Sequence, residues 1–173
     1  MNLQADLDKA LHRIPWFLEL NQDQFNRLAG ITSFIELDSG ELLFNEGDRE
    51  DFMYILLEGQ VVLEIEVPTR GQVPFYIAEV LDVIGWSSLT PVVRQRITSA
   101  RTSQPSLLVA IQSKLLEQMC EEDHELGYIV MRRVANVVAN RMLTIRLCLM
   151  EIIAQSAPPP GGVETPSLAQ SHP

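Results

Sequence analysis

The stretch that decides the fold runs from Asp38 to Val62 and reads DSGELLFNEGDREDFMYILLEGQVV. Short apolar runs alternate in it with turn residues, and three of the turns contain Gly40, Gly47 and Gly59. Glycine suits tight turns because it adopts a positive φ without a steric penalty. Short apolar segments separated by such turns predict antiparallel β-strands.

The same rhythm continues on both sides, from Ile31 to Ile111. Val61, Leu63 and Ile65 alternate with Glu64 and Glu66, as in a strand with one buried face. Strands this short and this dense predict an antiparallel sandwich or barrel. The expected strands are Ser33–Leu37, Glu41–Asn45, Asp51–Glu58, Gln60–Val67, Pro74–Val80, Ile97–Thr102 and Ser106–Ile111.

Helical periodicity appears before and after this β region. The sequence predicts an N-terminal helical segment over residues 1–30, in which Asn21 would cap a helix with Gln24 three residues on and Gly30 would end it. After the strands, Ser113 can cap a short helix through Cys120. Asp123 can then cap a long helix that runs to about Ile153.

The long helix carries two apolar strips. One steps by four and three residues in alternation, which is the a/d seam of a coiled coil and predicts a homodimer. The seam residues are Met131, Ala135, Val138, Met142, Ile145, Leu149 and Ile152. A second strip can pack on the domain: Leu126, Ile129, Val130, Val134 and Val137. The alternative is a single helix with one broad stripe that faces the core.

Charge and composition limit the function. The 173-residue chain has 13 Lys and Arg against 23 Asp and Glu, a net charge of −10, which disfavours generic DNA binding because basic side chains drive binding to phosphates. Within this acidic chain the long helix is basic, with Arg132, Arg133, Arg141 and Arg146 and no acid between Glu125 and Glu151.

Several kinds of protein lack support in the sequence. No run of 18 apolar residues predicts a membrane span. The two cysteines, Cys120 and Cys148, have no disulfide-like spacing, so we expect a reduced, cytoplasmic protein. The three histidines have no partner at metal-ligand spacing, and no nucleophile motif is present, so we expect no metal, no catalytic residue and no enzyme activity.

Two motifs resemble one family, the cyclic-nucleotide-binding domains of catabolite activator proteins, kinase regulatory subunits and gated channels. The first is the glycine-punctuated run from Asp38 to Val62. The second, Ile84-Gly-Trp-Ser-Ser-Leu89 followed by Arg94-Gln-Arg-Ile-Thr-Ser-Ala100, resembles the family's phosphate-binding cassette. The resemblance covers about Leu18 to Ile152. It implies a mainly β fold, a jelly-roll β-barrel with flanking helices and a long C-terminal dimerisation helix.

The cassette has a physical logic. Backbone N–H groups after Gly85 can meet a phosphate at the start of a short helix, and an arginine can add charge-assisted bonds. Arg96 lies eleven residues after Gly85, which is the family's spacing, and Arg94 is a second candidate. By this resemblance the ligand-binding residues are Gly85, Trp86, Ser87, Ser88, Arg96, Ile97 and Thr98.

Trp86 departs from the family pattern. Family cassettes usually have glutamate there, and it accepts hydrogen bonds from the ribose hydroxyl, whereas an indole is a donor only. Losing a charged acceptor costs about 1.5–3 kcal/mol, so we expect cAMP or cGMP to bind weakly or not at all. Trp86 could fill the sugar's space, stack on a base or pack in the core, and these roles stay open.

The expected organisation is a helical segment 1–30, a barrel 31–112 that contains the cassette-like segment 84–100, helices 113–155 and a Pro-rich tail 156–173 that we expect to be disordered. The tail is too short for a helix-turn-helix domain, so a stand-alone regulatory module that does not bind DNA by itself is expected. Two hypotheses follow. One is a sensor of a nucleotide or another anionic ligand that signals to a protein partner through the dimer helix, and the other is a ligand-free dimeric scaffold.

Overall fold

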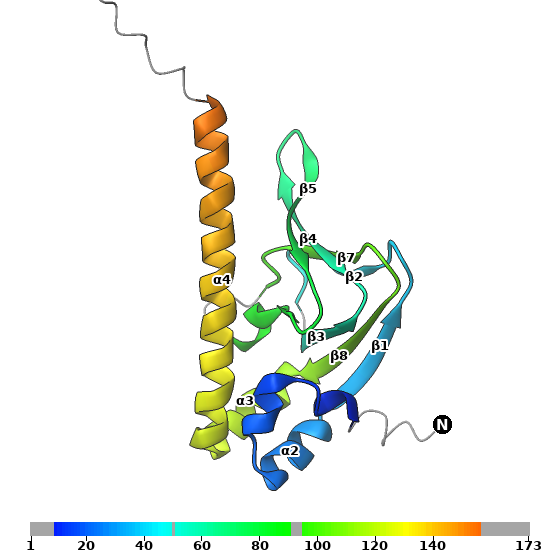
Figure 1. Ribbon diagram of the computed structural model, residues 1–173, viewed down its shortest axis with the longest axis vertical. Coiled ribbons are helices and arrows are strands. Elements are labelled where there is room, and N and C mark those ends of the chain that lie inside the picture. The colour runs from blue at the N-terminus through cyan, green and yellow to red at the C-terminus, as the bar shows by residue number, and fades with distance from the viewer. Residues whose placement is uncertain (1–8, 50, 91–94, 157–173) are drawn as a thin grey trace, which may run out of the picture.

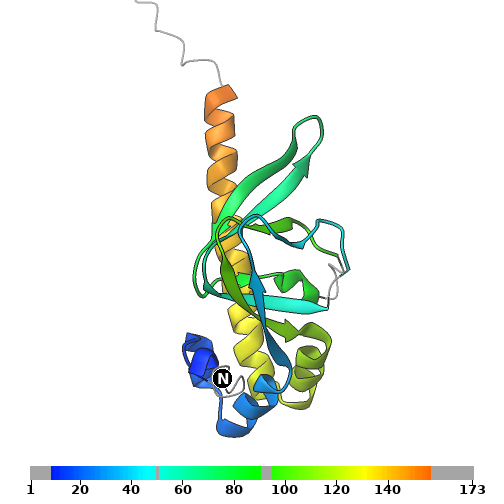
Figure 2. The ribbon, with the colours of Figure 1, turned by 90° about the vertical axis from the view of Figure 1, so that its right-hand side faces the viewer.

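Two four-stranded antiparallel sheets form a jelly-roll, and one long helix runs along its side (Figures 1 and 2). The computed structural model describes residues 9–49, 51–90 and 95–156. The first sheet has the order β1-β8-β3-β6 and the second β2-β7-β4-β5. The fold class expected from the sequence, mainly β with flanking helices, is therefore confirmed.

The strands follow the turn chemistry of the sequence closely. All seven expected strands are present within a few residues, and the shortest strand, β6, is an additional one that the sequence did not reveal. The strands are β1 (Thr32–Leu37), β2 (Leu42–Phe44), β3 (Phe52–Glu58), β4 (Val61–Val67), β5 (Gly71–Ala78), β6 (Val83–Ile84), β7 (Ser99–Thr102) and β8 (Ser106–Gln112).

The central strands β3 and β8 of the first sheet are covered on both faces, which explains why they are apolar. In β3, Met53, Ile55 and Leu57 belong to the core beneath the helices, whereas Tyr54 and Leu56 point into the space between the sheets. β8 alternates in the same way and pairs with β3 from Phe52–Gln112 onward. A strand buried on both faces has no polar alternation, as the run FMYILL shows.

The β4–β5 hairpin extends beyond the rest of the barrel and lies level with the outer half of the long helix (Figure 1). Val61 and Leu63 are buried as their alternation predicts, but Ile65 is 36% exposed, so that part of the predicted buried face is wrong. Pro74 lies inside β5, where a register shift next to it leaves Phe75 as an extra residue on an edge strand. Proline is tolerated at such a place because an edge bulge does not need its missing N–H.

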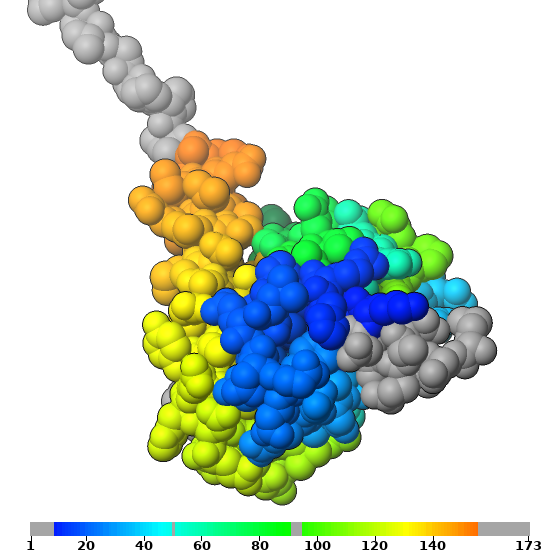
Figure 3. All heavy atoms as spheres, turned by 60° about the horizontal axis from the view of Figure 1, so that its bottom comes forward, coloured from blue at the N-terminus to red at the C-terminus, as the bar shows by residue number. Residues whose placement is uncertain are grey.

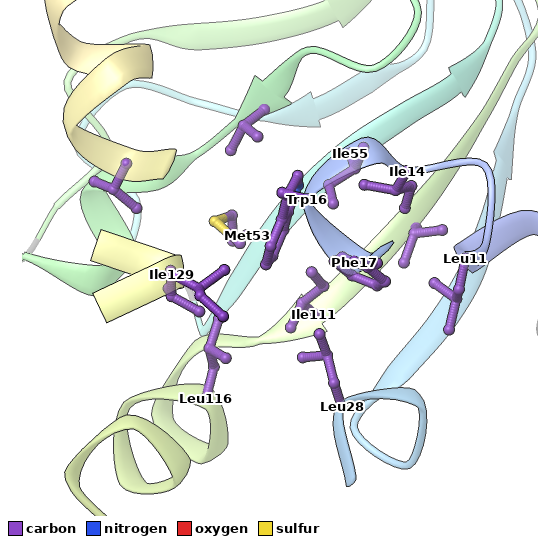
Figure 4. Close-up of a cluster of buried hydrophobic side chains, with 14 of the residues drawn as sticks. Leu11, Ile14, Trp16, Phe17, Leu28, Met53, Ile55, Ile111, Leu116 and Ile129 are labelled. Atoms are coloured by element: carbon purple, nitrogen blue, oxygen red, sulfur yellow. The ribbon is translucent and has the colours of Figure 1, made fainter. Parts of the chain in front are cut away.

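The N-terminal elements close one end of the core. The 3-10 helix η1 (Pro15–Glu19) inserts Trp16 and Phe17, and α2 (Gln22–Ala29) begins with the predicted capping box between Asn21 and Gln24. Figure 4 shows how these side chains meet strands β3 and β8 and the two C-terminal helices. Figure 3 shows the N-terminal residues against the lower part of the long helix, with that helix's end projecting from the body.

The C-terminal helices are α3 (Ser113–Glu122) and α4 (His124–Ser156). Ser113 does not cap α3 through its side chain, contrary to expectation, because its hydroxyl donates to Ser88 Oγ at 2.6 Å. Asp123 does cap α4, accepting from the N–H groups of Glu125 and Leu126 at 3.0 and 3.1 Å. No helix in the described ranges is long and apolar enough to cross a membrane. The predicted tail lies outside the described residues, except that Ser156 is still helical.

Alanine substitution at Gly59 tests whether the turn between β3 and β4 requires glycine. Its φ is +87°, and a Cβ there would lie 2.3 Å from the Pro105 carbonyl oxygen, whereas Gly40 (φ +85°) faces open space. Gly40→Ala should therefore cost about 1–2 kcal/mol for the left-handed backbone alone. Gly59→Ala should cost at least about 1 kcal/mol more, because the backbone must also shift. Urea unfolding measures both, and equal losses would contradict the packing described at Gly59.

Candidate functional site

The cassette segment begins where β6 ends. Gly85 follows β6 with φ +74° and leads into the short 3-10 helix η2 (Trp86–Leu89). A Cβ on Gly85 would lie 2.2 Å from Nη1 of Arg96. Glycine is thus required here both by its backbone conformation and by the guanidinium that lies against it.

Arg96 points into the protein. It is 3% exposed, and its Nη1 donates to the carbonyl oxygen of Gly85 at 2.7 Å. Its Nη2 donates to the carbonyl oxygen of Phe52, the first residue of β3. The guanidinium therefore ties the cassette to a central strand of the first sheet.

An aromatic surface supports the same guanidinium. Its central carbon Cζ lies 4.3 Å from the ring centre of Phe44 and 5.7 Å from that of Tyr54. The rings of Phe44 and Tyr54 are stacked at 6.1 Å, and Phe52 lies next to Tyr54. Sequence reasoning missed these aromatic residues as part of the site, although the i, i+2 spacing of Phe52 and Tyr54 places both on one face of β3.

The main chain of Arg96 is held as well. Its N–H donates to the Asp48 carbonyl at 2.9 Å, and its carbonyl accepts from the Gly47 N–H at 2.8 Å. The glycine turn between β2 and β3 thus fixes the backbone from which the arginine side chain enters the core.

Two hydroxyl groups of the cassette segment, those of Ser88 and Thr90, donate hydrogen bonds within the chain. Ser88 Oγ donates to the Gly85 carbonyl at 2.8 Å, and Thr90 Oγ1 donates to the Ser87 carbonyl at 2.9 Å. Ser88 Oγ also accepts the bond from Ser113 described above. These contacts join η2 to the start of α3.

Comparison with known proteins now identifies the family. The model of the cyclic nucleotide-binding domain matches residues 34–123. The chain belongs to the cyclic nucleotide-binding domain family. Members of this family are regulatory ligand-binding domains and are not typically catalytic.

Solved structures share the fold. A putative cyclic nucleotide-binding protein from Geobacter metallireducens is 28% identical, with a TM-score of 0.67 and coverage of 78% of this chain and 96% of that chain. A cyclic nucleotide-binding domain from Methylobacillus flagellatus is 19% identical, with a TM-score of 0.72 and coverage of 87% and 86%. The sensor domain of the transcriptional regulator DNR from Pseudomonas aeruginosa is 17% identical, with a TM-score of 0.68 and coverage of 82% and 95%.

The residues expected to bind a ligand in this cyclic nucleotide-binding domain do not all gather at one point. Gly85 and Arg96 touch, and Ser87 and Ser88 lie in the adjoining η2, with Ser87 buried. Ile97 points outward and is 47% exposed, and Thr98 is half-buried. Arg94, the second candidate for a phosphate contact, lies outside the described residues.

Trp86 is half-buried and packs against the core beneath the helices. Of the three roles considered for its indole, core packing is the one that these contacts support. A half-buried indole offers a ribose hydroxyl no acceptor, so the chemical difference from a glutamate cassette remains.

Neither a metal cluster nor a basic hollow supports the cassette interpretation among the features that the described residues show. No group of three or more His, Cys, Asp or Glu there could hold a metal ion. One open hollow is lined by Glu36, Asp38, Glu41 and Glu58, away from the cassette. Four carboxylates at one hollow disfavour an anionic ligand there.

The two strips of α4 differ as the sequence predicts. Leu126, Ile129, Val130, Val134 and Val137 are all at most 8% exposed and belong to the core. Of the seam residues, Ala135 is exposed and Val138 is half-buried against the core. The other five are 43–68% exposed, namely Met131, Met142, Ile145, Leu149 and Ile152. Large apolar residues off the seam in the outer half of α4 are exposed to a similar extent, 54–66%, namely Leu143, Leu147, Met150 and Ile153.

Replacing Arg96 tests its structural contribution. Arg96→Met leaves two buried carbonyls without their donors, so the free energy of unfolding should fall by about 2–3 kcal/mol. Arg101→Met is the matched control: Arg101 donates to the Gly40 carbonyl, but its side chain is 46% exposed, and its loss should cost less than about 1 kcal/mol. Urea unfolding of both variants checks this, and equal effects would contradict the internal role of Arg96.

Proposed function

We propose that this chain is a regulatory module that works as a homodimer through α4 and binds cAMP weakly or not at all. The observation that carries the proposal is the division of α4 into a buried strip and an exposed apolar seam. The barrel is the regulatory domain. The long helix α4 contacts the second copy of the chain and transmits the signal to a further protein.

The exposed seam supports dimerisation energetically. Full burial of an exposed large apolar side chain is worth roughly 1.5–3 kcal/mol, and the five large seam residues are 43–68% exposed, so each can gain about half of that. Association must first overcome at least about 4 kcal/mol. The free energy gained by burying the seam on both copies exceeds that cost when it is summed over Met142, Ile145, Leu149 and the other seam residues. Repulsion between the positive charges of the two helices opposes dimerisation less than the sequence suggests. Arg141 is buried against the barrel, and Arg132 pairs with Glu19.

The cassette contacts bear on the two ligand hypotheses. Arg96 donates to two main-chain carbonyls, and the hydroxyls of Ser88 and Thr90 donate to others. A phosphate would compete with these bonds, and Trp86 offers the ribose no acceptor. Both points favour a ligand-free scaffold over a cAMP sensor. A sensor of a different anionic ligand is the second candidate, favoured by the presence of Arg96 at the cassette spacing.

The remaining expectations belong to the same proposal. We place the module in the cytoplasm, because both cysteines are free thiols. Burial raises the pKa of the Cys120 thiol to about 11, which disfavours the nucleophilic thiolate. We assign the module no enzymatic activity and no metal or other cofactor.

Calorimetric titration tests the ligand part. With the wild-type protein, cAMP and cGMP should give no submicromolar dissociation constant, because the lost charged acceptor weakens binding by roughly 10- to 150-fold relative to a cassette that keeps the glutamate. Trp86→Glu restores the acceptor and should tighten cAMP binding by at least about tenfold. A submicromolar constant for wild type would refute the proposal for cAMP.

Light scattering tests the dimer. The wild-type chain at tens of micromolar should have about twice the mass of 19.5 kDa, and Met142→Glu with Ile145→Glu should halve it, because two charges enter each copy's seam. Arg146→Glu, off the seam, is the control and should leave the dimer mass. A wild-type mass near 19.5 kDa would instead make the exposed seam a monomer surface.

A further inference from the structure

Two arginines of α4 reach one corner of the barrel. The corner joins β5 to β6 and contains residues 79–82. Arg133 Nη2 donates to the Leu81 carbonyl at 3.3 Å, and two turns further along the helix Arg141 Nη2 lies 3.5 Å from the Val83 carbonyl. α4 therefore touches the segment that leads directly into the cassette.

Of the two arginine side chains, that of Arg141 is the more buried and makes more contacts with the barrel. It is 7% exposed, and its Cζ lies 3.2 Å from the ring centre of Tyr76. Its Nη2 lies 3.9 Å from Asp82 Oδ2, which also accepts a 2.8 Å hydrogen bond from the Tyr76 hydroxyl. Three side chains from α4, β5 and the corner thus form one polar joint, in which Arg141 is buried and Tyr76 and Asp82 are half-buried.

Removing the charges of Arg141 and Asp82 from water costs free energy, and the contacts within the joint must offset that cost. Burial lowers the pKa of Arg141 to about 10 and raises the pKa of Asp82. Nε of Arg141 is buried with no hydrogen-bond partner in the described part of the chain. Helix packing alone does not require a charge at this position, since the other residues that α4 buries against the core are apolar.

The corner itself is constrained. Leu81 has φ +73°, a conformation that a branched residue adopts only when its surroundings impose it. Its N–H donates to the Leu56 carbonyl at 2.7 Å, and the Asp82 carbonyl accepts from the Leu56 N–H at 3.1 Å. Strand β6 begins two residues after Leu81 and ends at Ile84, directly before Gly85, against which Arg96 lies. A displacement of the corner would therefore also displace β6 and the start of the cassette at Gly85.

We propose that Arg141 is a positioning residue that couples the outer half of α4 to the cassette through Tyr76, Asp82 and the β5–β6 corner. The inference deepens the proposed regulatory function and rests on it, because the coupled helix is the proposed output. When the joint is intact, the cassette and the dimer helix move as one unit. When it is broken, the two are released together while the core beneath η1 and α2 stays ordered.

Hydrogen–deuterium exchange of the full chain tests the coupling. Arg141→Met keeps an apolar stem but removes the charge and the stacking. Amide exchange should rise at least about tenfold in two separate regions, α4 beyond residue 141 and residues 79–90. Exchange in α2 and in β1 should stay unchanged. Arg146→Met, an exposed arginine of the same helix, is the matched control and should change neither region.

Two further variants keep the test decisive if Arg141→Met does not fold. Tyr76→Phe keeps the ring and removes only the bond to Asp82, and Arg141→Lys keeps the charge without the planar stack. Both should show the same two-region pattern at smaller size. A rise in α4 alone, with residues 79–90 unchanged, would overturn the coupling.

Light scattering on the same samples separates this failure from that of the proposed function. A monomeric wild type with the two-region pattern leaves the coupling standing and removes only the dimer output. A dimeric wild type without the pattern removes only the coupling.

Discussion

The buried guanidinium of Arg96 is the interaction on which the site depends. It donates to the carbonyls of Gly85 and Phe52 and lies over the ring of Phe44, so it joins the cassette to strands from both sheets. Several sequence features follow from it. Gly85 has no room for a side chain, and the Gly47 turn holds the arginine's main chain. A phosphate ligand would therefore have to compete with groups that also support the fold.

The second constraint is the position of α4 in an acidic protein. Its four arginines do not form one solvated face: Arg141 is buried against Tyr76, Arg133 donates to Leu81, and Arg132 pairs with Glu19. These contacts bind the helix to its own chain and leave the apolar seam exposed beside them. Charge and apolar packing therefore share the barrel-facing side of α4, where Arg141 follows the buried Val137 by about one helical turn.

Local chemistry made most of the fold predictable. The strands ended where glycine turns indicated, and Asn21 and Asp123 cap their helices as expected, because caps and turns depend on neighbours in sequence. The failures are long-range. Ser113 bonds Ser88 across 25 positions, and Ile65 lies on a hairpin that extends past the core. β6 has only two residues, too few for any periodicity.

The site was less predictable for the same reason. The spacing from Gly85 to Arg96 located the cassette, yet nothing local shows that the arginine faces Phe44 and Tyr54, which come from other strands. The joint of Arg141, Tyr76 and Asp82 was also invisible, since its members are up to 65 positions apart and each resembles an ordinary surface residue. Tertiary packing, and not residue type, determines which arginines are buried.

The most direct measurement is NMR of the ¹⁵N-labelled arginine side chains, with Arg96 assigned from the Arg96→Lys variant. A guanidinium held between the Gly85 and Phe52 carbonyls should show slow exchange of its Nη protons with water and slow rotation about its C–N bonds. Addition of about 1 mM cAMP should leave the slow proton exchange and the slow rotation intact, because even a weakly bound ligand should not displace the guanidinium from its two carbonyls. Fast proton exchange, either without ligand or on addition of cAMP, would contradict the internal role of this arginine.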